Sequence, residues 1–253
     1  MALRRVLALA RELGLPTGDP VVVKDGSNLL VHLRPAPVVA RAATTTAAVR
    51  GPRVADHFRR AIAVSGHLAA RGVPVVGDPA DAPPGPHLVE GVVVAFAAFV
   101  AHDPDWRPDP ASFATLLAEL HAELRDYPGP LPTRGPLDDV DAALALLGGP
   151  PELVARRDEL VARWPELLVQ PLHGDAHAGN LLGTARGPVW NDFEDTWRGP
   201  VAWDVATAAR SRLLDRAAVV ARYPAAGLEF HLALRELMAE CWALAARAVA
   251  QPR

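Results

Sequence analysis

The chain has 253 residues, of which 50% are hydrophobic and 22% are charged, and its mean hydropathy is +0.11. This composition is typical of a soluble globular protein and excludes fibrous, collagen-like and largely disordered chains. The 26 basic and 29 acidic side chains leave a formal net charge of −3. Because nucleic acid binding selects for a basic excess, we expect no nucleic acid partner.

The single cysteine and the length of the apolar runs limit the compartment and the kind of site. Cys241 is the only cysteine, which excludes an intramolecular disulfide and a zinc site built from several cysteines. The longest apolar run, residues 92–101, has ten residues, half of the roughly 20 that a membrane-spanning helix needs. We therefore expect a cytoplasmic protein with no membrane partner.

The N-terminal part of the chain is predicted to be rich in strands. The Asp25-Gly26 pair is a hairpin turn signal between two apolar runs, and Gly72 is a C-terminal stop for the helix before it. In chain order we expect a helix at 3–13, strands at 21–23, 29–33 and 38–41, a helix at 54–71, and a hairpin that pairs 87–89 with 92–100.

The pattern changes to helical periodicity after a connector at 102–110. Helices are expected at 111–125, 137–147, 151–168 and from 204 to the end, with short strand-like runs at 170–173 and 189–192. The chain is therefore predicted to be an α+β protein, with a β-rich lobe at 1–101 and a helix-rich lobe at 102–253.

Polar residues gather in two segments, 172–182 and 189–204. The residues between them are enough for a strand and a turn, which brings Asp175, Asn180 and Asp192 within reach of one another. Carboxylate and amide oxygens suit a hard cation such as Mg²⁺, which usually shares its ligands with substrate phosphates. Phosphoryl transfer needs that metal and a carboxylate that accepts the proton of the attacking hydroxyl.

The motif at 173–180, His-Gly-Asp-Ala-His-Ala-Gly-Asn, resembles the HGDxHxxN motif of the aminoglycoside phosphotransferase and choline kinase-like family. Asp192-Phe193-Glu194 stands where that family has D-F/W-D/E. Further similar segments are Leu120-His121, Gly199-Pro200 and Trp203-Asp204-Val205-Ala206. The resemblance covers nearly the whole chain and implies a two-lobed protein kinase-like fold with ATP, or GTP, between the lobes.

The resemblance also implies a role for each residue of the motif. It makes Asp175 the catalytic base and makes Asn180 and Asp192 the Mg²⁺ ligands. Its other implied site residues are His173, His177 and Asp204 as supports of the site, and the backbone of Phe96, Ala97, Ala98 and Phe99 as the adenine contact. Glu194 is a candidate acceptor contact, and Trp197, which follows the Asp192 segment, is either a core or wall residue or a second acceptor contact.

The chain departs from the family pattern on the nucleotide side. Its single lysine, Lys24, lies on the first strand, so Arg41 on the third strand is expected to bind phosphate, which a guanidinium does well. Ala61 stands where the family has a helix Glu that pairs with the third-strand cation. The phosphate-covering loop has one glycine and depends on backbone groups of Ser27 and Asn28.

The resemblance implies an enzyme that transfers the γ-phosphoryl group of ATP or GTP to a hydroxyl of a small molecule with Mg²⁺. One alternative is a catalytically degenerate nucleotide-binding protein, because of Ala61 and the missing third-strand lysine. Another is a metallohydrolase, since His173, Asp175 and His177 alternate as strand residues on one face do. The carboxylates of the last helix either face solvent or meet a cationic substrate. The acceptor and the oligomeric state stay open.

Overall fold

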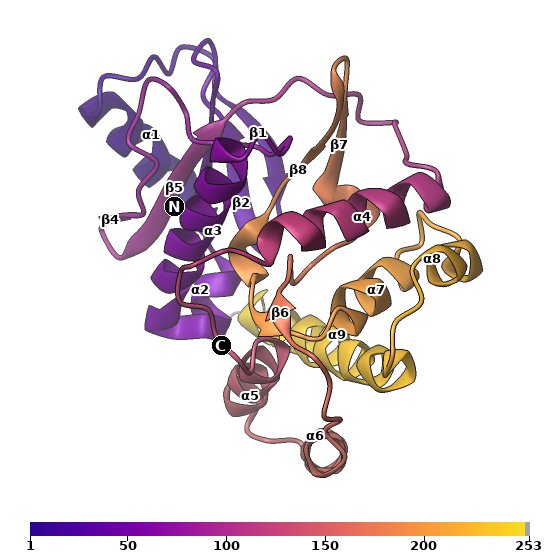
Figure 1. Ribbon diagram of the computed structural model, residues 1–253. Coiled ribbons are helices and arrows are strands. Elements are labelled where there is room, and N and C mark those ends of the chain that lie inside the picture. The colour runs from indigo at the N-terminus through magenta and orange to yellow at the C-terminus, as the bar shows by residue number, and fades with distance from the viewer. Residues whose placement is uncertain (251–253) are drawn as a thin grey trace.

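The computed structural model describes residues 1–250 and has a sheet-containing N-terminal region beside a mainly helical C-terminal region (Figure 1). The sheet is antiparallel, with the strand order β1-β2-β3-β5-β4. Its strands are β1 (Val21–Asp25), β2 (Asn28–His32), β3 (Val38–Ala43), β4 (His87–Val89) and β5 (Val92–Ala98). The helices of this region are α1 (Ala2–Glu12), α2 (Thr45–Arg50) and α3 (Val54–Ala70), with a 3-10 turn, η1 (Gly51–Arg53), between α2 and α3.

The two faces of this sheet are covered by different helices, because successive side chains of a strand point to opposite sides. One face packs against α1 in a cluster of buried side chains. The other face, which carries Val93 and Ala95, packs against Phe58 of α3. Arg41 lies opposite Ala95 in the β3–β5 register, so it belongs to the α3 face of the sheet.

In the C-terminal region, helices surround two short antiparallel strand pairs. Its helices are α4 (Pro110–Leu124), α5 (Pro136–Leu147), α6 (Pro151–Ala162), α7 (Ala202–Ala209), α8 (Arg216–Arg222) and α9 (Leu228–Ala250). The short strands are β6 (Gln170–Pro171) with β9 (Arg198–Gly199), and β7 (Leu181–Thr184) with β8 (Gly187–Trp190); the 3-10 turns are η2 (Ala178–Asn180) and η3 (Phe193–Asp195). The longest helix, α9, packs against α5, α6 and α7.

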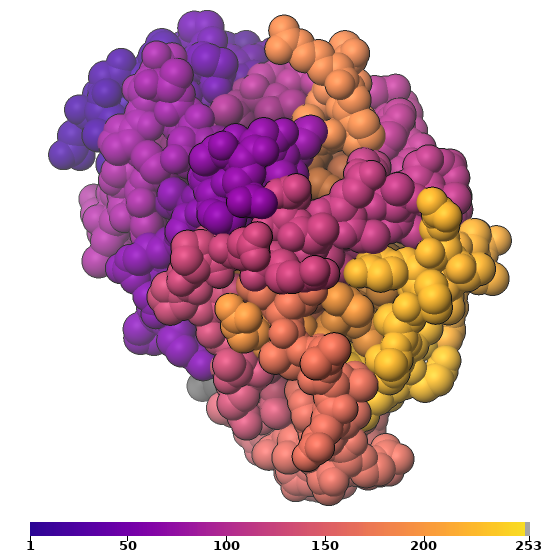
Figure 2. Space-filling model, in the orientation of Figure 1, coloured from indigo at the N-terminus to yellow at the C-terminus, as the bar shows by residue number. Residues whose placement is uncertain are grey.

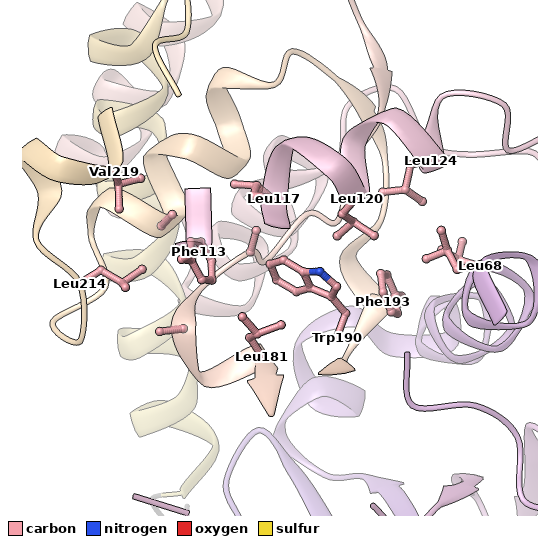
Figure 3. Packing of buried hydrophobic residues seen from close by; sticks show 14 of the residues in the cluster. Leu68, Phe113, Leu117, Leu120, Leu124, Leu181, Trp190, Phe193, Leu214 and Val219 are labelled. Atoms are coloured by element: carbon pink, nitrogen blue, oxygen red, sulfur yellow. The ribbon is translucent and has the colours of Figure 1, made fainter. Parts of the chain in front are cut away.

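One hydrophobic cluster connects the two regions. Trp190, at the end of β8, and Phe193 pack among leucines of α4 and against Leu68 of α3 (Figure 3). These aromatic side chains are almost fully buried. The cluster therefore fixes the chain around the β7–β8 hairpin against both α3 and α4, while the tip of that hairpin stays exposed and projects above α4 (Figure 2).

The expected mixture of a β-rich N-terminal part and a helical C-terminal part is observed, with differences at element ends. The helix expected at 151–168 ends at Ala162, because the residue before Pro165 disfavours helical backbone. The long helix expected from 204 is three helices, separated by residues 210–215 and by a segment with Pro224 and Gly227. The short helix α2 has no counterpart among the predicted elements. No helix within residues 1–250 is long and apolar enough to span a membrane.

Candidate active site

Four residues of the predicted site, Asp175, His177, Asn180 and Asp192, line one cavity of about 340 Å³. The loop that carries the first three runs from β6 to β7, and Asp192 follows β8. The β7–β8 hairpin turns the chain back, and the Asn191 N–H donates to the carbonyl of Asn180 at 2.9 Å. Pairing of the two strands therefore brings the motif and Asp192 to the same cavity.

Asp204 fixes the backbone at the start of the motif. This fully buried residue of α7 accepts hydrogen bonds from the N–H groups of His173 (2.8 Å) and Gly174 (2.9 Å). It also accepts one from Nε2 of His121, at 2.9 Å. Three donors on one buried carboxylate satisfy its charge and fix the start of the loop, because hydrogen bonds to a charged acceptor are stronger than neutral ones.

Two further features of the loop fix the position of Asp175. The buried ring of His173 donates from Nε2 to the carbonyl of Asn191 and accepts from the Asp175 N–H at Nδ1, which assigns the tautomer. Gly174 has φ +90°, and a Cβ on it would lie 1.9 Å from the carbonyl oxygen of Asp195. Only glycine fits there, since an L side chain meets both the unfavourable φ and the neighbouring backbone.

Asp175 lies between a guanidinium and an imidazole. Nη2 of Arg235, from α9, donates to its Oδ1 at 2.5 Å, and Nε2 of His177 lies 3.4 Å from its Oδ2. Burial opposes ionisation of this carboxyl, but Arg235 and His177 outweigh burial and lower the pKa of Asp175 to about 2. Asp175 is therefore held in place and ionised at neutral pH.

Asn180 and Asp192 form an oxygen donor pair that fits Mg²⁺. The amide of Asn180 donates from Nδ2 to the Asp175 carbonyl at 2.9 Å, which directs the amide group within the loop. Asp192 has left-handed backbone, with φ +69° and ψ +64°, a conformation that non-glycine residues adopt at a cost and often at functional sites. One carboxylate and one amide oxygen leave positions for water and phosphate oxygens, as Mg²⁺ sites usually do. No group of three His, Cys, Asp or Glu side chains within residues 1–250 could hold a metal, so the metallohydrolase alternative gains no support.

Arg41 reaches the same site from the sheet. Its Nη1 donates to Asp192 Oδ1 at 2.5 Å and to Glu194 Oε2 at 2.7 Å. Burial opposes its charge, but the two carboxylates outweigh burial and raise the pKa of the Arg41 guanidinium. Ala61 of α3 lines a smaller cavity together with Arg41 and contributes no charge to it. The partner of the third-strand cation therefore comes from the segment after β8 and not from the helix.

Glu194 is a buried residue that connects the segment after β8 to β2, β3 and α2. Its carboxylate accepts hydrogen bonds from Asn28 of β2, from Arg41 and from Arg50 of α2. Burial and the charge of Asp192 raise the pKa of Glu194 to about 7 despite the two arginines. Both carboxylate oxygens have protein partners in this structure, and the expected contact of Glu194 with an acceptor stays a prediction.

Trp197 lies outside the cavity that contains Asp175. It is 1% exposed and lines a second cavity of about 150 Å³ beside Gly135 and Trp203. Asp195 and Met238 border both cavities. Trp197 is therefore a wall residue of the neighbouring cavity, in agreement with one of its two interpretations from the sequence, and its contact with an acceptor stays a prediction.

The predicted nucleotide-binding backbone is partly used within the fold. The N–H groups of Phe96, Ala98 and Phe99 donate to the carbonyls of Pro84, Gly77 and Pro37, and Ala97 pairs with Val39 of β3. Ser27 and Asn28 line the cavity at the turn between β1 and β2. The turn between β1 and β2 therefore faces the cavity, whereas three N–H groups of the 96–99 segment already have acceptors.

The model of the phosphotransferase enzyme family (APH) matches residues 17–241. The chain belongs to this family. A search of curated proteins found no match. The matched residues include every motif residue described above, from Arg41 to Asp204, and exclude only the two ends of the chain.

Solved structures of family members share the fold at low sequence identity. Choline kinase LicA from Streptococcus pneumoniae is 12% identical, with a TM-score of 0.66 over 100% of this chain and 94% of that one. Aminoglycoside phosphotransferase APH(3'')-Id from Streptomyces rimosus is 15% identical, with a TM-score of 0.66 over 94% and 99%. An aminoglycoside-3'-phosphotransferase of type VIII is 19% identical, with a TM-score of 0.64 over 95% and 98%. These likenesses show the protein kinase-like fold of this phosphotransferase family member.

Two arginines of the site were not found from the sequence of this phosphotransferase family member. Arg50 is 4% exposed and donates to Asp139 of α5 at 2.7 Å and to Asp195 at 2.5 Å. Arg235 lies on α9 one turn before Met238, and both side chains line the cavity with Asp175. Arg50 belongs to a six-residue helix without a sequence signal. For Arg235, the helical spacing to Met238 is the one usable signal, and it indicates only a shared face.

Proposed function

We propose that the protein transfers the γ-phosphoryl group of ATP, or GTP, to a hydroxyl of a small molecule in a Mg²⁺-dependent reaction. The observation that carries this proposal is that Asp175, Asn180, Asp192 and Arg41 line one cavity. Residues 1–101 supply the nucleotide side, and residues 102–253 supply the catalytic residues and the acceptor side. Membership of the phosphotransferase enzyme family supports the reaction class.

In the proposed reaction Asp175 acts as the base. Its carboxylate accepts the proton of the acceptor hydroxyl while the hydroxyl oxygen forms a bond to the γ-phosphorus. The bond between the γ-phosphorus and the bridging oxygen breaks, and the nucleoside diphosphate leaves. The hydrogen bonds that backbone N–H groups of the loop donate to Asp204 and to His173 Nδ1 keep the Asp175 carboxylate in the position that this transfer needs.

Charge on the phosphates is balanced by the residues of the nucleotide side. Mg²⁺ held by Asn180 and Asp192 would neutralise charge on the phosphate oxygens. Arg41 adds a guanidinium, which binds phosphate oxygens with two donors. Glu194 holds Arg41 at 2.7 Å and so takes the orienting part that a helix Glu has in other family members. The turn with Ser27 and Asn28 covers the phosphates, and the nucleobase contacts the backbone of the segment from Phe96 to Phe99.

A catalytically degenerate nucleotide-binding protein is the second candidate, and one observation favours it. Arg235 already occupies an oxygen of Asp175, and Arg41 already occupies an oxygen of Asp192. A chain that no longer transfers phosphate can keep such ion pairs at no functional cost. The two candidates differ in transfer and agree in nucleotide binding.

The test combines nucleotide binding with transfer. We expect Mg²⁺-dependent thermal stabilisation by ATP or GTP; a nucleotide at a hundred times its Kd adds about 2.7 kcal/mol. Asp175→Asn should keep this stabilisation and lose about 10²- to 10⁴-fold in transfer, measured with radiolabelled ATP. Asp192→Ala should weaken the Mg²⁺-dependent part of binding. Undiminished transfer by Asp175→Asn would refute the role of the base, and binding without transfer to any hydroxyl compound favours the degenerate candidate.

A further inference from the structure

One wall of the cavity is formed by one face of α9. Arg235, Met238 and Trp242 lie on this face and line the cavity beside Asp175. The guanidinium of Arg235 lies over the ring of the buried Trp203, 5.5 Å from its centroid, which holds the side chain in place. The only charged group that α9 presents to the cavity is therefore a cation next to the proposed base.

No carboxylate in the cavity is free to bind a cationic acceptor. Four carboxylates line it: Asp175, Asp192, Glu194 and Asp195. Each already has an arginine within 3.0 Å, from Arg41, Arg50 or Arg235. An ammonium group that entered the cavity would have to compete with one of these guanidinium groups.

The carboxylates of α9 do not provide an additional negative charge at the cavity. Glu229 pairs with Arg216, and Glu240 pairs with Arg156. Neither glutamate lines the cavity that contains Asp175. Glu236 is exposed and also lies outside that lining. The alternative that these side chains meet a cationic substrate is therefore not supported by their positions.

Some N–H donors of Arg235 have no partner among the described residues. Within the described part of the chain its guanidinium has two partners, Asp175 Oδ1 through Nη2 and the sulfur of Met238 through Nη1 at 3.7 Å. A guanidinium has five N–H donors in a planar fork, and the side chain is 19% exposed toward the cavity. An oxyanion is the ligand that this fork fits best.

We infer that the acceptor is a small hydroxyl compound with an oxyanion, a carboxylate or a phosphate group, and that Arg235 binds this oxyanion. The inference rests on the proposed function and names the substrate class of the same site. Arg235 and Asp175 are in contact, so one small molecule reaches both with its oxyanion and its hydroxyl. The oxyanion draws Arg235 away from Asp175 Oδ1, and the freed carboxylate then accepts the proton of the hydroxyl.

The volume of the cavity agrees with a small acceptor. The space of about 340 Å³ also contains the phosphate side, with Lys24, Ser27 and Arg41 in its lining. Cavities for drug-sized ligands start at about 300 Å³. The phosphate tail of a nucleotide and the acceptor would share this space, which favours a small acceptor.

Calorimetric titration of the full chain with Mg²⁺ and the non-hydrolysable nucleotide AMP-PNP tests the inference. The anionic probes are glycerate and glycerol 3-phosphate, glycerol is the neutral match, and choline and the aminoglycoside kanamycin are the cationic probes. We expect at least one anionic probe to bind more tightly than glycerol and than both cations. Arg235→Ala should weaken that binding by about 10- to 100-fold, the usual range for a charge-assisted hydrogen bond.

Two variants control for indirect effects. Arg235→Lys keeps the charge and loses the fork, so it should recover part of the anion affinity. Arg247→Ala removes an exposed arginine from the same helix and should leave all affinities unchanged. The thermal stability of each variant is measured beside the titrations to confirm that it folds.

The outcomes separate the two proposals. If neither AMP-PNP nor its guanine counterpart GMP-PNP binds with Mg²⁺, the proposed function itself is refuted. Binding of AMP-PNP without binding of any anionic probe, or tighter binding of choline or kanamycin, overturns the inference and leaves the proposed function standing. Equal affinity of the anionic probe for the wild-type protein and Arg235→Ala also overturns it. An equal loss for anionic and neutral probes assigns Arg235 to a general structural role and not to acceptor recognition.

Discussion

Removal of the Arg50 guanidinium is expected to destabilise the folded chain more than removal of any exposed arginine. Arg50 is 4% exposed and contacts three carboxylates, Asp139, Glu194 and Asp195, at 2.7, 3.4 and 2.5 Å. In Arg50→Met the hydrocarbon part of the side chain is kept and the charge is lost. The carboxylates then remain buried or half-buried without their main counter-charge.

The size of the effect follows from this geometry. Breaking a buried ion pair by removing one partner costs about 3–5 kcal/mol, because the remaining charge loses its compensation. For a chain of this length 1 kcal/mol shifts Tm by about 2–4 °C, so Tm should fall by roughly 6–20 °C. The free energy of unfolding is measured by urea titration with tryptophan fluorescence.

Matched variants make the result interpretable. Arg216→Ala removes an arginine whose single pair with Glu229 is exposed, and it should change the free energy of unfolding by less than about 1 kcal/mol. Arg50→Lys keeps the charge but loses the two-donor contact with Asp139, so its stability should lie between those of Arg50→Met and the wild-type protein. A loss below 1 kcal/mol in Arg50→Met, similar to that in Arg216→Ala, would refute the reasoning.

Three more predictions concern the motif loop. Gly174→Ala places a Cβ against the Asp195 carbonyl at φ +90°, so we expect a loss of about 1–3 kcal/mol in unfolding free energy and of most of the transfer activity, whereas Gly187→Ala, with open space around it, should show backbone strain alone. Asp204→Asn turns one acceptor oxygen into a donor among three donors, which should cost about 1–3 kcal/mol and lower kcat; unchanged kcat would contradict the bracing of the loop. The pKa of Asp175 is lowered to about 2, so its ionised form stabilises the folded chain fully above about pH 4, and this contribution is lost as the pH falls through about 2. In Asp175→Asn the free energy of unfolding should therefore depend less on pH between 4 and 2, measured by urea titration, and an unchanged pH dependence would contradict the ion pair with Arg235.

The sequence determined the parts of the site that lie close together in the chain. The motif at 173–180 and Asp192 are separated by one short hairpin, and the pairing of β7 with β8 alone brings them together. The residue types carry the chemistry, and the alternation of side chains on β3 directs Arg41 to the α3 face. The strands and most helices follow from apolar periodicity and turn signals, which act over a few residues.

Only the tertiary structure decided which charges meet. Arg50 is 145 positions from Asp195, and Arg235 is 60 positions from Asp175, and no periodic pattern connects such residues. Glu194 and Trp197 are near the motif in the chain, yet packing binds the carboxylate of Glu194 to arginines and directs Trp197 into another cavity. Buried charges must find partners because desolvation is costly, but a partner comes from any element that the fold brings near. The chain's own sequence therefore indicates the reaction class, and the arginines that α2 and α9 bring to the cavity decide how its carboxylates are paired.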